Sequence, residues 1–135
     1  MFDIKNILYP INLDSKDYSL VKKAVEVAKS LNSSIHILYV NDPGAGFRHP
    51  TDREDAIALE VREAVPSDLL NSVNIRYAVS KGDLAKEVWA YCKDNGIDLI
   101  ITGHKHRNRL YSMLFDSPDE SIIDEIQIPA LILPK

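Results

Sequence analysis

The sequence predicts an α/β fold in which a single domain, residues 1–135, forms a doubly wound, five-stranded parallel sheet with helices on both faces. Short apolar runs rich in Ile, Val and Tyr alternate along the chain with longer segments of helical periodicity. Runs of this kind are typical of strands that are buried on both faces. A repeated strand–helix order makes the strands parallel, and right-handed crossovers carry the helices to the two faces.

The five expected strands are the apolar runs between the helical segments. They are Asn6 to Ile11, Ser34 to Val40, Val73 to Val79, Ile97 to Thr102 and Ala130 to Leu133.

Four helices connect these strands. They are expected over Tyr18 to Leu31, over Thr51 to Val65, from Asp83 to Asn95-Gly96, and from about Pro118 to Ile126. Pro66 ends or kinks the second helix, because proline lacks an N–H and clashes with the preceding turn. Asp83 is a preferred N-cap residue, and Gly96 supplies the stop of the third helix.

Composition and net charge limit the cellular compartment and the classes of binding partner to be expected for this protein. A net charge of −4 argues against bulk attraction to nucleic acid or to an anionic membrane. No apolar run is long enough to cross a membrane, and MFDIKNILYP lacks the pattern of a secretory signal. The single cysteine, Cys92, cannot form an internal disulfide, as is usual in a reducing compartment. We therefore expect a cytoplasmic protein with neither a nucleic-acid nor a membrane partner.

Ligands of doubly wound sheets bind beyond the carboxyl ends of the strands, where the strand order reverses. The loops after Ile11, Val40 and Thr102 are therefore the candidate binding loops. The chain contains neither GxxxxGK[ST] nor GxGxxG, so the commonest phosphate loops are absent.

The histidines and Cys92 do not predict a metal or nucleophile site. A zinc site needs three or four convergent ligands, whereas His104 and His106 stand apart from His36 and His49 in the sequence. Cys92 lies in the apolar stripe of the third helix and is most simply a core thiol. We expect no catalytic residue, no metal and no cofactor.

The segment GHKHRNRLYSMLFDSPDES, which starts at Gly103, combines a basic patch with a helix start. Its basic half, Lys105 to Arg109, could capture a phosphate or another anion, or it could be a solvated loop; exposed charge runs are common, which favours the loop. Its acidic half, Ser117-Pro118-Asp119-Glu120, is a capping box in which Ser117 accepts from amides of its own helix.

The chain resembles the universal stress protein family over essentially its whole length. The resemblance rests on the order and spacing of NILYPINLD, LVKKAVEVAKSLNSSIHILYVND, SKGDLAKEVWAYCKDNGIDLIITGH and IPALILPK. It implies a Rossmann-like fold with a five-stranded parallel sheet, a homodimer often formed through the final strand, and a part in surviving stress.

Nucleotide-binding members of that family carry Gly, two residues, Gly, nine residues, Gly, and then Ser or Thr. Gly103 and Ser117 stand at the first and last positions here, but His106 and Asp116 replace the second and third glycines. The aspartate that recognises the base in those members corresponds to Asn12. These departures resemble the UspA subfamily, whose representatives are associated with failure to bind ATP.

The residues at the two replaced glycine positions also argue against ATP binding on physical grounds. The His106 side chain fills space where backbone amides would approach phosphate. Asp116 adds a like charge that costs on the order of 4 kcal/mol at ~4 Å and an effective dielectric constant of about 20. We expect a UspA-like, non-catalytic homodimer of the stress response that does not bind ATP tightly.

The alternative is a stress sensor that binds a nucleotide or small anion. Its modified adenine-nucleotide pocket would be formed by Asn12, Val40, Gly103, His106 and Ser117. A nucleotide hydrolase is the weakest alternative, because neither an activated nucleophile nor a set of metal-binding carboxylates is visible.

Overall fold

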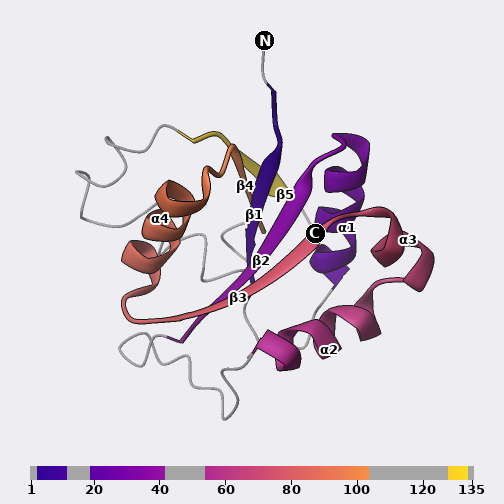
Figure 1. The fold of residues 1–135 in the computed structure, drawn as a ribbon, viewed down its shortest axis with the longest axis horizontal. Coiled ribbons are helices and arrows are strands. Elements are labelled where there is room, and N and C mark those ends of the chain that lie inside the picture. The colour runs from indigo at the N-terminus through magenta and orange to yellow at the C-terminus, as the bar shows by residue number, and fades with distance from the viewer. Residues whose placement is uncertain (1–2, 12–18, 42–53, 104–127, 134–135) are drawn as a thin grey trace.

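The computed structural model describes residues 3–11, 19–41, 54–103 and 128–133 (Figure 1). All strand pairs are parallel, and the five-stranded sheet has the order β3-β2-β1-β4-β5. The predicted fold class is therefore confirmed. The strands are β1 (Asn6–Pro10), β2 (Ser34–Asn41), β3 (Ile75–Lys81), β4 (Leu99–Gly103) and β5 (Ala130–Leu133), and the helices are α1 (Ser19–Ser30), α2 (Glu54–Ala64), α3 (Ser67–Ser72) and α4 (Leu84–Asn95).

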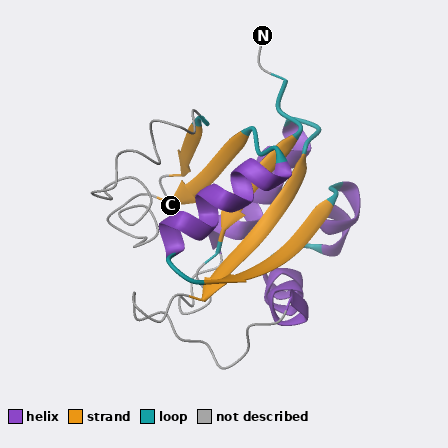
Figure 2. Cartoon of the chain, turned by 60° about the vertical axis from the view of Figure 1, so that its left-hand side comes forward, coloured by secondary structure: helices purple, strands orange, loops and turns teal. Residues whose placement is uncertain are grey.

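The helices cover both faces of the sheet. α4 lies across one face, while α1, α2 and α3 lie on the other (Figures 1 and 2). Along β1, Ile7 and Tyr9 belong to the core beneath α1 and α2, and Leu8 belongs to the core beneath α4. Because successive strand side chains point to opposite faces, burial on both faces requires the continuous apolar runs seen in the sequence.

Local sequence signals set the ends of α4 as predicted. The Asp83 carboxylate accepts a hydrogen bond from the Lys86 backbone N–H at 3.0 Å. Gly96 takes the left-handed conformation, with φ of 61°, and its N–H bonds to the Cys92 carbonyl. Both ends are therefore stabilised by the residue types that their geometry favours.

The segment after α2 differs from the prediction. Pro66 ends α2, as expected, but it also precedes a second short helix, α3, which the sequence pattern did not indicate. Pro66, with φ of −59°, precedes the first helical residue of α3, a position where no N–H is needed. Val73 is the extended residue that ends α3, so β3 begins at Ile75 and not at Val73.

Within the described residues, other differences amount to one or two residues at element ends. The helix predicted over 118–126 and the first residues of the one predicted over 51–65 lie outside the described residues. Within the part of the chain that the structure describes, no helix has the length and apolarity needed to cross a bilayer.

Candidate functional site

The candidate site lies at the reversal of strand order between β1 and β4. From β1 the chain adds β2 and β3 on one side, and β4 and β5 on the other. Because the strands are parallel, the carboxyl ends of β1, β2 and β4 lie at one end of the sheet. The loops that the sequence analysis selected, after Ile11, Val40 and Thr102, therefore all start at this end.

Pro10 limits the pairing of β1 with β4. The Ile11 N–H donates to the Leu38 carbonyl of β2 at 2.8 Å, so the alternation of the strand turns the nitrogen of Pro10 toward β4. That nitrogen carries no hydrogen and cannot donate to a ladder. The register of β1 with β4 accordingly ends at Leu8 and Ile100. Sequence reasoning missed this role, although a proline at the end of a central strand was the available signal.

Two of the predicted site residues lie among the described residues. Val40 is 4% exposed and packs in the core beneath α4, so its side chain is not accessible to a ligand. Gly103 is the buried last residue of β4 and is in register with Leu133. Asn12, His106 and Ser117 lie outside the described residues, as does Asp116.

Thr102 is a further polar group at this end of the sheet. The side chain is 1% exposed, and its hydroxyl oxygen has no hydrogen-bond partner within the described ranges. A buried hydroxyl without a partner costs about 1–3 kcal/mol, and such a group in a native structure calls for a functional or structural reason. A threonine that ends the apolar run IDLIIT was the sequence signal for this residue.

The described residues argue against thiol chemistry. Cys92 is 2% exposed in the core beneath α4, as predicted, and burial raises its pKa to about 12. The thiolate is the nucleophilic form, so Cys92 is inert near neutral pH. Among the described side chains, no three His, Cys, Asp or Glu residues converge as metal ligands would.

His36 joins a second polar cluster at the opposite end of the sheet. Its Nδ1 lies 2.7 Å from the Tyr91 hydroxyl of α4, and its Nε2 lies 3.2 Å from Asn6 Oδ1 of β1. Because an amide oxygen only accepts, Nε2 carries the proton and Nδ1 accepts from Tyr91. Burial, and then the nearby Arg76 guanidinium, lower the pKa of His36 below its usual value of 6.5. The neutral imidazole therefore links α4 to the sheet.

Known proteins match this chain over nearly its full length. The universal stress protein family matches residues 3–134. A universal stress protein A homolog of Haemophilus influenzae is 29% identical over 141 residues, covering 96% of this chain and 96% of the relative. Universal stress protein A of Photorhabdus laumondii is 29% identical over 138 residues, covering 96% of this chain and 94% of the relative.

Solved structures share the fold. A universal stress protein in complex with cAMP has a TM-score of 0.63 at 16% identity, covering 98% of each chain. The universal stress protein from Archaeoglobus fulgidus in complex with dAMP has a TM-score of 0.62 at 13% identity, covering 98% of this chain and all of that one (100%). At such low identity the likeness shows the fold alone. Taken with the sequence match across residues 3–134, the chain belongs to the universal stress protein family and is UspA-like.

Proposed function

We propose that this chain acts in the stress response as a cytoplasmic homodimer that catalyses no reaction and does not hold ATP tightly. The observation that carries the proposal is the loop that begins at Gly103, where His106 and Asp116 stand at two glycine positions of the nucleotide-binding pattern. Gly103 ends β4 next to the reversal of strand order, so the altered loop leaves the sheet where a triphosphate would be held. A side chain and a carboxylate at those positions oppose the approach of phosphate to backbone amides.

The exposed final strand supports the dimer. β5 is an edge strand, and its Leu131 and Ile132 are 38% and 39% exposed. Exposed apolar edge strands tend to be paired or covered in native assemblies. Pairing with β5 of a second copy would remove these side chains from water.

A second candidate is binding of an adenine mononucleotide, which carries less phosphate than ATP. Two observations favour it: structures of the same fold were solved with cAMP and with dAMP, and the Thr102 hydroxyl is buried at the carboxyl end of β4 without a partner in the described part of the chain. A ribose or base could supply the missing hydrogen bond to Thr102. This candidate keeps the binding site at the carboxyl ends of β1 and β4 and changes only the ligand.

Calorimetric titration with ATP, ADP, AMP and cAMP tests both candidates. The leading proposal expects no binding isotherm with ATP, and a saturable ATP isotherm would refute it. Saturable binding of AMP or cAMP that weakens about tenfold in Thr102→Val, the cost of roughly one hydrogen bond, would select the second candidate. A His106→Gly, Asp116→Gly double variant that gains ATP binding would support the account of the altered loop.

A further inference from the structure

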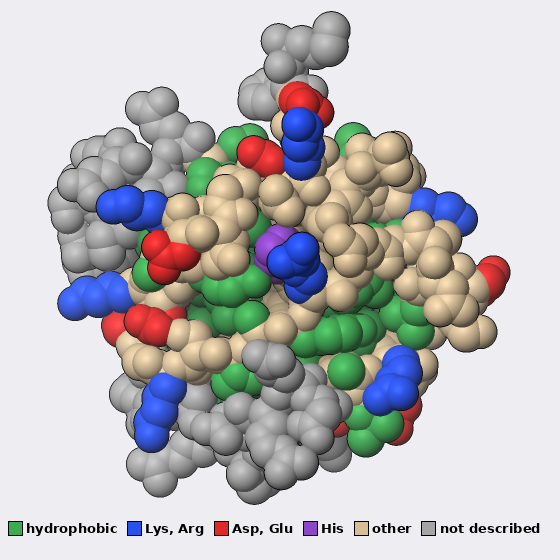
Figure 3. All heavy atoms as spheres, in the orientation of Figure 1, with side chains coloured by type: hydrophobic (Ala, Val, Ile, Leu, Met, Phe, Trp, Pro, Cys, Tyr) green, Lys and Arg blue, Asp and Glu red, His purple; other side chains and the backbone are tan. Residues whose placement is uncertain are grey.

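α4 covers one face of the sheet, and a buried histidine lies between the two. His36 of β2 is 3% exposed, and its ring meets the Tyr91 ring of α4 edge to face, with ring centroids 5.6 Å apart. The imidazole accepts from the Tyr91 hydroxyl and donates to the Asn6 amide of β1. Figure 3 shows a histidine side chain that is almost covered, with a basic side chain in front of it and hydrophobic side chains beside it. His36 therefore connects α4 to two strands of the sheet.

The groups around His36 oppose a positive charge on its ring. Tyr91 and Asn6 are neutral, and Arg76 of β3, which is in register with His36, is a cation. Burial, and then the Arg76 guanidinium, lower the pKa of His36. Within the described ranges, no carboxylate lies within 4.0 Å of the ring nitrogens of His36. A proton on this ring would therefore have no opposite charge beside it.

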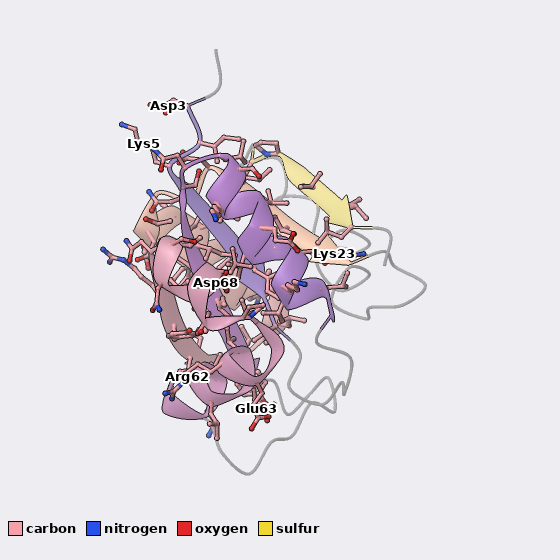
Figure 4. The ribbon with its side chains drawn as sticks, turned by 90° about the vertical axis from the view of Figure 1, so that its right-hand side faces the viewer. Asp3, Lys5, Lys23, Arg62, Glu63 and Asp68 are labelled. Atoms are coloured by element: carbon pink, nitrogen blue, oxygen red, sulfur yellow. The ribbon has the colours of Figure 1, made fainter. Side chains whose placement is uncertain are left out.

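The nearest carboxylates of the adjoining elements already have partners. Glu87 of α4 accepts from the Ser80 hydroxyl of β3, and Asp98 accepts from the backbone N–H groups of Lys5 and Asn6 at 3.0 Å each. Other charged side chains belong to the N-terminal segment or to the helices on the opposite face of the sheet. Figure 4 labels six of these side chains, which are Asp3, Lys5, Lys23, Arg62, Glu63 and Asp68.

Protonation changes both the charge of His36 and its hydrogen bond to α4. A protonated imidazole has two donors and no acceptor, so the Tyr91 hydroxyl can no longer donate to it. The charge would also remain in a nearly closed site beside Arg76, where an uncompensated charge is unfavourable. Contact of the ring with water removes this cost, and that contact requires a neighbouring element to move.

α4 is the neighbour of His36 that is able to move. β2 pairs with β1 on one side and with β3 on the other, so its displacement would break the backbone hydrogen bonds of two ladders. α4 instead meets the sheet through side chains. Gly82 and Gly96 lie at its two ends, with φ of 141° and 61°. Glycine accepts the large backbone changes that a hinge requires.

We propose that α4 is an acid-released cover: when His36 takes up a proton, α4 separates from the sheet and exposes the apolar side chains between them. These side chains include Leu38 of β2 and Val88 and Cys92 of α4. The strands keep their pairing, because the change is confined to the contact of α4 with the sheet. The accessibility of this apolar face thus depends on pH. The release requires neither the β5 dimer nor a bound nucleotide.

The test is the rate at which Cys92 reacts with 4,4′-dithiodipyridine between about pH 5 and 7.5. Cys92 is the only cysteine of the chain and is 2% exposed, so its rate reports the opening of α4. Each rate is divided by that of the urea-unfolded chain at the same pH, which removes the pH dependence of the thiol itself. The ratio should be constant above about pH 6.5 and rise several-fold by pH 5, by at most about tenfold per pH unit. A ratio that does not change with pH would overturn the proposal.

Amide hydrogen exchange followed by NMR separates release of α4 from unfolding of the whole chain. On acidification, the protection factors of α4 amides such as that of Val88 should fall by the same factor by which the Cys92 ratio rises. Those of Ile35 and Ile37 in β2 should stay higher and should not fall in parallel. A parallel loss of protection in α4 and β2 would show global unfolding and overturn the proposal.

Two substitutions assign the release to His36. His36→Phe keeps a ring that cannot take up a proton, so the Cys92 ratio should lose its rise at low pH; a rise of the parent size would overturn the proposal. Arg76 is exposed, so its substitution leaves the core intact. Arg76→Gln removes the cation that opposes protonation and should reduce the rise, whereas the control Arg76→Lys should keep it. A rise in the glutamine variant that equals or exceeds that of the lysine variant would contradict the assignment.

Discussion

Single residues at strand ends determine the local chemistry of this protein. Pro10 withdraws one donor from the β1–β4 ladder, and Thr102 brings a buried hydroxyl to the same end of the sheet. Neither follows from hydrophobic pattern, because the pattern indicates which residues are buried and not which backbone or side-chain groups lack a partner. The sequence did predict Val40 and Gly103 at this end, since both end apolar runs.

His36 makes stability depend on pH. Its pKa is lowered in the folded state, so the unfolded state binds more protons below about pH 6.5. The contribution of His36 is present in full above pH 6.5 and is lost as pH falls through its folded pKa. We expect the free energy of unfolding to fall with pH by at most about 1.4 kcal/mol per unit from this group.

Urea unfolding between pH 4.5 and 7.5, compared with His36→Phe, measures this contribution. The other three histidines are present in both proteins and cancel in the comparison. The stability advantage of His36 over Phe should shrink as the pH falls. An advantage that grows on acidification would mean that the folded pKa is raised, contrary to the burial of the ring.

At the scale of elements, the caps of α4 were predictable because they depend on neighbouring residues. Asp83→Ala should lower the free energy of unfolding by about 0.5–2 kcal/mol, because the Lys86 N–H loses its acceptor. Asp83→Asn, which keeps an acceptor, is the matched control and should stay near the parent value. Denaturant unfolding of the parent and of both variants measures the difference. An alanine variant as stable as the parent would show that the cap contributes nothing to stability.

The end of α4 gives a second prediction at this scale. Gly96 has φ of 61°, and an added Cβ would meet nothing within 4 Å. Gly96→Ala should therefore cost only the backbone strain, about 1–2 kcal/mol. A loss well above this range in thermal or urea unfolding would indicate a steric clash that the geometry does not contain.

β3 and α3 show why element boundaries were less predictable than element types. Ser67–Ser72 is too short for helical periodicity to stand out, and Val73 and Asn74 continue the polar–apolar alternation that leads into β3. Tertiary packing decides the boundary, because Ile75 is the first residue of the segment in register with β2. The pairing partner lies forty residues earlier in the chain, beyond any local signal.

β5 is the element on which the proposed assembly depends. Lysine at Leu131 and Ile132 should shift the protein from dimer to monomer in sedimentation velocity, because charges on an edge strand oppose pairing. Lysine at Leu59, which is 54% exposed on α2, is the control and should leave the mass unchanged. A protein that remains a dimer with both β5 substitutions would show that the dimer interface does not involve β5.

At the scale of the whole molecule, the sheet has two edges, β3 and β5, and a reversal of strand order between β1 and β4. We propose that β5 serves self-association and that the altered nucleotide loop, which begins at Gly103, leaves the sheet beside the reversal of strand order. The sequence predicted this architecture because the alternation of strands and helices leaves few arrangements. The chemistry at the carboxyl ends of β1 and β4 depends on three-dimensional proximity, which the order of residues does not contain.

Native mass spectrometry of the gently purified protein tests the central proposal most directly, because one spectrum reports both assembly and bound nucleotide. The account predicts a species of twice the 15.2 kDa chain mass with no ATP attached. A species that carries ATP, or a monomer that persists as the protein concentration rises, would contradict it.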